Sequence, residues 1–294
     1  MNKKISYLSI ILSMTIFGSI GIFRRFLPMS SALLAFFRGL VGALFLLLFC
    51  LCTGKKQFDQ SVRKKLPLLL VSGGLIGFNW ILLFESYNYT TVPTATLCYY
   101  MAPVIVLLLS PLFLKEKLTA KKAVCAVLSL FGIVLVSGIL KEGGIGKTDL
   151  KGILFGLGAA LLYAAVIMLN QKLGTLSAFS KTILQLFSAS LVILPYLLLT
   201  EGVPSVRYSL PTLGLLLLVG ILHTGVAYAL YFGSMSALNA QSVALLGYID
   251  PVVAILLSAL ILKEPFGFSE AVGALLILGS SLVAEIDFPK KKKA

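Results

Sequence analysis

The sequence predicts an all-α polytopic membrane protein in which ten transmembrane helices form two inverted five-helix repeats. Three observations predict this fold class. The chain of 294 residues is 59% hydrophobic and 12% charged, with a mean hydropathy of +1.01. Its apolar residues lie in long blocks, and the second half repeats part of the first. Because a soluble domain carries about 25% charged residues, this composition excludes a soluble enzyme, a disordered chain and a nucleic-acid-binding domain.

The expected spans are apolar blocks of about 20 residues, the length that crosses the hydrocarbon core. The blocks lack the alternation of a transmembrane β-barrel. The first block follows a basic start, as in a signal peptide, but it is span-length and we expect it to stay as the first helix. Polar turns divide neighbouring spans, and Asn239-Ala240-Gln241 alone divides the eighth from the ninth. The ten spans are 5–23, 32–52, 66–88, 92–114, 120–139, 151–171, 180–200, 209–231, 241–262 and 268–286.

The distribution of lysine and arginine predicts the orientation. With the N-terminus inside, the cytoplasmic segments hold 17 of the 25 basic residues and the outer loops hold 7, while Arg38 lies within the second span. Cytoplasmic loops of membrane proteins carry an excess of Lys and Arg. We therefore expect both termini in the cytoplasm and the chain in a cell membrane. The basic tail at 290–293 is expected to meet anionic headgroups.

An internal repeat links the two halves of the chain. Offset by 148 positions, residues 84–137 align without a gap on 232–285 with 18 identities in 54 positions. Because the unit contains five spans, the second copy must be inverted. We place the two repeats at 1–142 and 143–294. Inverted repeats put a site near the midplane between two moving halves. The most specific matches are Pro103 on Pro251, Tyr100 on Tyr248, and Leu114-Lys115-Glu116 on Leu262-Lys263-Glu264.

These motifs resemble the EamA-type carriers of the drug/metabolite transporter superfamily. The matching stretches run from Ser86 to Pro103, including Tyr99-Tyr100-Met101-Ala102-Pro103-Val104, and through 114–116 with their copies in the second half. Arg38 is similar to an arginine that those carriers often place in the second span. The resemblance covers nearly the whole chain and implies transport. It leaves the substrate open, because the family spans amino acids, nucleobases, sugars, choline-like cations and drugs. Glu85 departs from the pattern, which usually has an uncharged residue there.

Ionisable side chains within spans are candidate site residues, because each costs about 2.5–3.5 kcal/mol at a helix centre. Asp250 and His223 lie nearest the middle of their spans. Asp250 precedes Pro251, and a proline frees a backbone carbonyl one turn earlier, so this carboxylate could bind a cation or hold a proton. The alternative is a structural carboxylate paired with His223 or with an arginine. His223 is expected either to pack with a hydrogen bond or to relay protons.

The other ionisable candidates lie toward the outer side of the membrane. Arg38 could bind a substrate carboxylate or form an ion pair with Glu85. Glu85 could contact the substrate or a coupling ion, or lie at the membrane interface. Arg24 and Arg25, at the end of the first span, are expected to extend to the interface.

Aromatic residues and prolines complete the candidate site. Tyr100 and Tyr248 precede the paired prolines by three residues, nearly one helical turn, and with Trp80 they could form aromatic walls for a flat or cationic solute. Pro103 and Pro251 are expected to act as hinges in the two halves. Most of the remaining aromatics are expected at the lipid belt or in packing. They include Phe84, Tyr99, Tyr163, Tyr228 and Tyr231.

The sequence therefore predicts a secondary transporter, an exporter or exchanger, for a small polar or amphipathic metabolite such as an amino acid. A flippase of a lipid or lipid-linked sugar with the same fold is the alternative, and a membrane-embedded enzyme is the rival from another class. We expect no catalytic residues, no metal site, no cofactor and no nucleic-acid partner. The expected partners are a small-molecule solute and the lipid bilayer. Proton coupling and a homodimer are both compatible with the sequence.

Overall fold

The computed structural model describes residues 3–54, 60–113, 119–137, 146–173, 176–201, 209–235, 238 and 246–285. The turn at 239–241, the motif at 114–116 and the basic tail at 290–293 lie outside the described residues. Within the described ranges every regular element is a helix, and seven helices are long and apolar enough to span a membrane. Two shorter apolar helices cover Ile249–Leu262 and Phe268–Ala284. The predicted all-α polytopic class is confirmed.

The helices follow the expected order of spans in both halves. The fourth, eighth and ninth spans each consist of more than one segment, and two of those segments, η1 and η2, are π-helices. The first half contains α1 (Lys3–Arg25), α2 (Ser31–Cys52), α3 (Gln60–Tyr89), α4 (Val92–Tyr99), α5 (Ala102–Phe113) and α6 (Ala120–Val136). The second contains α7 (Lys147–Leu173), α8 (Ala178–Thr200), α9 (Leu210–Leu218), η1 (Val219–Val226), α10 (Ala227–Met235), α12 (Ile249–Leu257), η2 (Ser258–Leu262) and α13 (Phe268–Glu285).

Hydroxyl side chains fix where five of these helices begin. In each case the side-chain oxygen of the capping residue accepts a hydrogen bond from a backbone N–H three residues later, which satisfies a donor that the first turn leaves free. The polar turns that divide the apolar blocks therefore also start the next helix. The capping residues are Ser30, Thr91, Thr119, Ser177 and Ser209.

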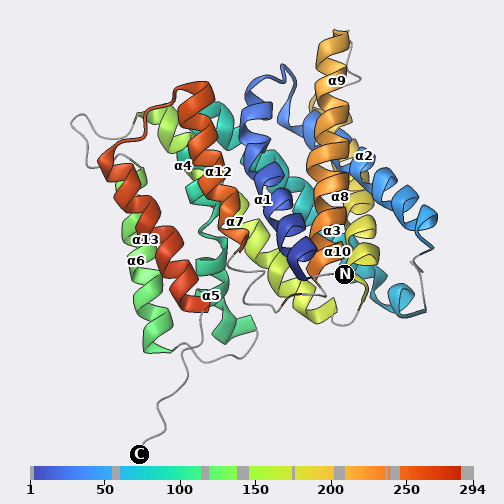
Figure 1. The fold of residues 1–294 in the computed structure, drawn as a ribbon, viewed down its shortest axis with the longest axis horizontal. Coiled ribbons are helices and arrows are strands. Elements are labelled where there is room, and N and C mark those ends of the chain that lie inside the picture. The colour runs from blue at the N-terminus through green and yellow to red at the C-terminus, as the bar shows by residue number, and fades with distance from the viewer. Residues whose placement is uncertain are drawn as a thin grey trace, which may run out of the picture.

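Equivalent helices of the two repeats pack against each other in antiparallel fashion. In the α6–α13 pair, Ser129 Oγ lies 2.6 Å from Ser280 Oγ, whereas Ser269 Oγ donates to the carbonyl of Leu135 at 3.1 Å. Residue numbers therefore increase along α6 in the direction in which they decrease along α13. Figure 1 shows these two helices side by side. Antiparallel packing of repeat-related helices is the arrangement that an inverted repeat requires.

The contacts between halves come in matched pairs. A Cβ atom added at Gly73 of α3 would meet the Ser188 Cβ of α8 at 2.5 Å. A Cβ atom added at Gly220 of η1 would meet the Val41 Cβ of α2 at 2.7 Å. Each residue of the first pair has its counterpart 147 positions away in the second. Small residues at both places let the helices approach closely, as at other interfaces between membrane helices.

The same exchange symmetry governs which helices are neighbours. Helix α3 packs on α7 and α8, and its counterparts η1 and α10 pack on α2 and α1. Helices α4 and α5 pack on α7, and α12 packs on α1. Figure 1 accordingly shows α1 between α12 and the α9–α10 helix. The first helix of each half thus packs mainly against helices of the other half.

The two repeat-related prolines follow breaks in the helices. The fourth span is interrupted at Tyr100 and Met101, and Pro103 is the second residue of α5. The ninth span is interrupted at Tyr248, and Pro251 is the third residue of α12. Proline is tolerated in a first helical turn because the N–H that it lacks would be unpaired there. The local opening expected around these prolines is therefore present in both halves.

The eighth span contains a feature that the sequence did not predict. Its middle winds as the π-helix η1, which carries His223 and Thr224 between α9 and α10. A π-helix accommodates one extra residue in an otherwise α-helical segment and is frequent at functional sites.

Candidate functional site

Arg38 is a buried cation at the contact between the two halves. It lies on α2 with 5% of its surface exposed, and its Nε donates to Thr224 Oγ1 of η1 at 2.8 Å. The guanidinium carbon lies 4.4 Å from the ring centroid of Trp80 and 5.8 Å from that of Phe84. These rings stabilise the charge through cation–π contacts. The expected alternative, an ion pair with Glu85, is wrong, because no carboxylate among the described residues lies within ion-pair distance of Arg38.

Asp250 supplies the opposite charge from the other half. It lies in the first turn of α12, is partly exposed, and interacts electrostatically with Arg38. The Tyr100 hydroxyl lies within hydrogen-bonding reach of the carboxylate and donates to the Gly247 carbonyl at 3.3 Å. The Tyr100 and Tyr248 rings are 6.4 Å apart between centroids. The two helix breaks thus bring Asp250 and both tyrosines together.

Three further tyrosines gather around this charge pair. Tyr99 stacks on Tyr163 with centroids 5.3 Å apart, and Tyr228 contacts Phe17 at 5.1 Å. Tyr99, Tyr163 and Tyr228 all interact electrostatically with Asp250. These three tyrosines therefore pack against other rings and also interact with the candidate site, a second role that the sequence did not predict. The repeat did hold a signal, because Phe17 and Tyr163 are near-equivalent positions and each contacts the ring of a tyrosine of this group.

His223 packs beside the site with one hydrogen bond. Its side chain is fully buried, its Nε2 pairs with Ser19 Oγ at 2.9 Å, and its ring meets that of Phe23 edge-on at 4.7 Å. The other ring nitrogen, Nδ1, has no hydrogen-bond partner among the residues that the structure describes. No carboxylate of the described chain pairs with His223, so the Asp250–His223 alternative is not found.

Glu85 lies apart from the charge pair. It is partly exposed on α3, and the charge that it acts on is the Arg24 guanidinium. The described residues offer it no hydrogen bond or ion pair. Trp80, one and a half helical turns earlier, and Phe84 are the residues of α3 that reach Arg38.

The two arginines at the end of α1 bind groups within the protein. Arg24 is only 6% exposed and donates to the Leu27 carbonyl at 2.9 Å and to Ser31 Oγ at 3.3 Å. The expectation that Arg24 extends to the membrane interface is therefore wrong. Arg25 forms an ion pair with Glu264 at 2.7 Å. A hollow of about 480 Å³ lies beside them, lined by Arg24, Arg25, Leu27, Pro28, Met29, Ser30 and Asn88.

The donor set of the described residues does not suit a metal ion. No group of three or more His, Cys, Asp or Glu side chains in the described ranges is arranged to hold one. What the site offers is one cation and one carboxylate from opposite halves, surrounded by aromatic rings. This arrangement can bind a solute through charges and rings.

Inverted halves, a helix break in each, and an arginine and an aspartate contributed by opposite halves define a membrane carrier. The EamA-like transporter family matches residues 4–138 and 150–285, one match in each half. The chain belongs to this family of the drug/metabolite transporter superfamily, and it is a transporter, not an enzyme.

Relatives agree with this assignment, and a solved structure shares the fold. The chain is 32% identical over 257 residues to "Uncharacterized transporter YxxF" of Bacillus subtilis, covering 87% of this chain and 81% of that protein. It is 30% identical to "Protein PecM" of Dickeya dadantii, covering 74% and 73%. One solved crystal structure matches 95% of this chain and 96% of its own with a TM-score of 0.67 at 19% identity, which supports the fold.

Proposed function

We propose that this transporter exports or exchanges a small metabolite carrying both a carboxylate and an ammonium group, such as an amino acid, across the cell membrane. The observation that carries the proposal is that the two halves contribute opposite charges, Arg38 and Asp250, which interact electrostatically. Both termini are proposed to lie in the cytoplasm, as the charge distribution favours. The solute moves between two aqueous compartments while the halves change their relative position.

Arg38 has the chemistry to bind the carboxylate of the solute. Its Nε is occupied by Thr224, whereas its two terminal nitrogens have no hydrogen-bond partner among the described residues. A guanidinium offers these two donors in the planar fork that matches a carboxylate. A buried charge whose donors are not hydrogen-bonded is costly, so an arriving carboxylate is favoured.

Asp250 has the chemistry to bind the ammonium group, and the rings around it suit the rest of the solute. Tyr99, Tyr100 and Tyr228 are partly exposed around it. Aromatic faces attract a desolvated cation and pack well against an apolar side chain. When no solute is bound, the carboxylate can hold a proton instead, which would couple transport to protons. Pro103 and Pro251 are proposed as hinges, because each follows a break that lets the helix change direction.

The fluorescence of Trp80 gives a direct test. It is the only tryptophan in the chain, and the Arg38 guanidinium lies over its ring. An amino acid that binds Arg38 should therefore change the emission of purified protein. Propionate and ethanolamine, which each carry only one of the two groups, serve as matched controls.

The proposal predicts that at least one amino acid changes the Trp80 emission and is transported into proteoliposomes, whereas the two singly charged probes bind at least about tenfold more weakly, because each forgoes one charge pair. Equal binding of propionate would contradict a site for both groups. Movement of a fluorescent lipid without movement of any amino acid would favour the flippase instead.

A further inference from the structure

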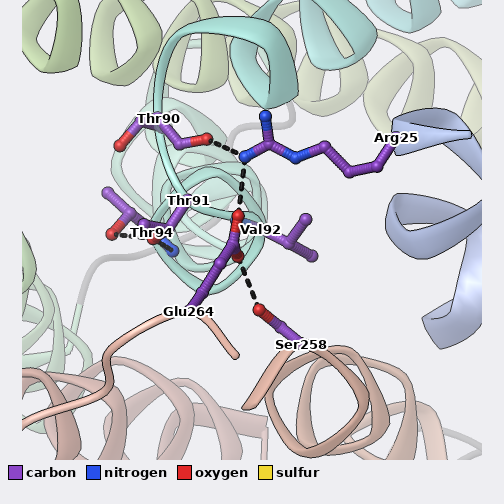
Figure 2. A network of polar contacts seen from close by, with 7 residues as sticks. All are labelled: Arg25, Thr90, Thr91, Val92, Thr94, Ser258 and Glu264. Carbon is purple, nitrogen blue, oxygen red and sulfur yellow. Dashed lines mark hydrogen bonds and ion pairs between the residues drawn. The ribbon is translucent and has the colours of Figure 1, made fainter. Parts of the chain in front are cut away.

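A polar network ties the two halves together at the end of the bundle where α1 ends, here named the Arg25 end. Glu264 accepts three hydrogen bonds through its two carboxylate oxygens. Its Oε1 accepts from Arg25 Nη2 at 2.7 Å, and its Oε2 accepts from the Val92 backbone N–H at 2.8 Å and from Ser258 Oγ at 2.5 Å. Arg25 Nη2 also donates to the Thr90 carbonyl at 2.8 Å. Figure 2 shows Glu264 between these partners.

Three separate parts of the chain meet at this carboxylate. Arg25 is the last residue of α1, and Thr90 and Val92 form the corner between α3 and α4, all in the first half. Ser258 begins η2 and Glu264 follows it, in the second half. Lys263, between η2 and Glu264, adopts a left-handed backbone with φ of 54°, which ends the helix directly before the carboxylate. The network therefore bridges the halves at this end.

The bonds in the network are of the stronger kind. Arg25 and Glu264 expose 31% and 14% of their side chains, so the pair is partly withdrawn from water. Hydrogen bonds with a charged partner are about twice as strong as neutral ones. The Val92 N–H lies in the first turn of α4, where backbone donors have no partner within their own helix and the helix dipole also favours a carboxylate.

The network lies on the side of the candidate site that faces the Arg25 end. Ser258 follows Asp250 by eight residues along α12, and Val92 precedes Tyr100 by eight residues along α4. At 1.5 Å per residue, both separations amount to about 12 Å along the helices. The network thus joins α4 and α12 about 12 Å from the helix breaks that carry Tyr100 and Asp250.

We propose that Arg25 and Glu264 form a latch that closes the Arg25 end of the transport path, and that this latch must break for the solute to pass there. The inference rests on the proposed function for the existence of a path. Movement of α12 and η2 away from both α1 and α4 at this end removes Glu264 from Arg25 and from the Val92 N–H together. In the orientation proposed above, the latch faces the outside of the cell.

The neighbouring contact between Ser30 and Glu201 offers a matched control. Ser30 Oγ donates to Glu201 Oε2 at 2.6 Å, and it joins the start of α2 to the end of α8 at the same end of the bundle. It therefore also bridges the halves through a carboxylate, but it contacts neither α4 nor α12. Glu201→Gln should leave the latch closed.

The test measures access to the site and requires no transport. A single cysteine replaces Tyr163, which is 38% exposed and stacks on Tyr99, in a protein without its four native cysteines. An impermeant maleimide is applied to each side of oriented membrane vesicles. Glu264→Gln and Arg25→Gln should each speed labelling from the Arg25 side about tenfold, the factor that corresponds to about 1.4 kcal/mol.

The labelling rates distinguish a latch from a contact that only stabilises the fold. Faster labelling in both latch variants, with an unchanged rate in Glu201→Gln, supports the latch. Unchanged labelling in both, with melting temperatures near that of the parent, overturns it. Arg25→Lys, which keeps the charge, gives a milder variant if Arg25→Gln does not fold, and it should label at an intermediate rate. Because labelling needs no solute, the latch can hold even if the amino acid proposal fails, and the reverse is also true.

Discussion

Arg38 and Gln185 occupy equivalent positions in the two halves, and each donates to a hydroxyl group in the third span of the other half. Arg38 Nε reaches Thr224 Oγ1 at 2.8 Å, and Gln185 Nε2 reaches Ser72 Oγ at 2.6 Å. Gln185 also donates to Asn170 Oδ1 at 2.6 Å. The repeat thus keeps the bond across the halves and varies the charge. The Gln185 amide nitrogen makes two hydrogen bonds within the protein, whereas the two terminal nitrogens of Arg38 have no hydrogen-bond partner among the described residues.

This relationship predicts the effect of Arg38→Gln. A glutamine can keep the bond to Thr224, as Gln185 does with Ser72, and it removes a buried charge that has no carboxylate within ion-pair distance among the described residues. We therefore expect a melting temperature equal to or above that of the parent, together with loss of amino acid binding measured by Trp80 fluorescence. A large drop in melting temperature would instead assign Arg38 a structural role.

Asp250→Asn should abolish concentrative transport while the protein still inserts and stays monodisperse. If Asp250 carries a proton, the variant should retain an exchange activity that no longer depends on pH. If it binds the solute directly, binding should be lost at every pH. Proteoliposome flux with and without a pH gradient distinguishes the two cases. Glu85→Gln is the control and should be mild, because Glu85 lies apart from the charge pair. Full pH-dependent transport by Asp250→Asn would refute the assignment.

Pro103→Ala and Pro251→Ala should slow transport more than they weaken solute binding. Both prolines lie in the first turn of a helix, so replacing them costs no hydrogen bond and should leave folding nearly intact. Alanine would allow the preceding break to close into continuous helix. Flux and Trp80 fluorescence measured on the same preparations give the two quantities. Unchanged flux in both variants would show that the prolines only pack.

Cysteines at positions 119 and 269 should label from opposite sides of the membrane in a protein without native cysteines. Thr119 caps the start of α6, and Ser269 bonds to Leu135 near the end of α6. These positions are therefore separated by the length of a span. Labelling of both from one side by an impermeant reagent would be incompatible with the inverted arrangement.

Gly73→Ala and Gly220→Ala should each destabilise the protein, because each new Cβ would meet a side-chain Cβ of the other half at 2.5 or 2.7 Å. Overpacking of this kind costs about 1–3 kcal/mol. Gly214→Ala is the control, since no described atom lies within 4 Å of its added Cβ. Thermal unfolding in detergent measures all three. Equal melting temperatures for Gly73→Ala and Gly214→Ala would show that the interface can relax.

The fold was predictable because each sequence pattern that indicates it is spread over many residues. Apolar blocks, Lys and Arg counts and the repeat each extend over many residues, so single errors average out. The breaks at Tyr100 and Tyr248 were likewise predictable, because Pro103 and Pro251 restrict the backbone locally. None of these inferences required knowing which face of a helix meets which neighbour.

The site was less predictable because it depends on helix rotation. Tyr99 and Tyr163 differ from lipid-facing tyrosines only in the direction of their side chains, and an apolar helix in lipid has no polar face to reveal it. Arg25 resembles any arginine at a membrane interface until Glu264, 239 positions later, is placed beside it. Contacts of this separation are set by packing between the halves.

The π-helix η1 records how the two halves became unequal. Gly73 and Gly220 correspond at an offset of 147, whereas the aligned block beginning at 84 and 232 corresponds at 148. The second copy therefore has one residue more between 220 and 232 than the first has between 73 and 84, in the stretch that η1 enters. A single insertion would rotate everything downstream by about 100° if the helix stayed regular. A wider π-helical turn accommodates the extra residue where it lies. The two repeats can therefore differ in length while the helix faces that form their interfaces stay aligned.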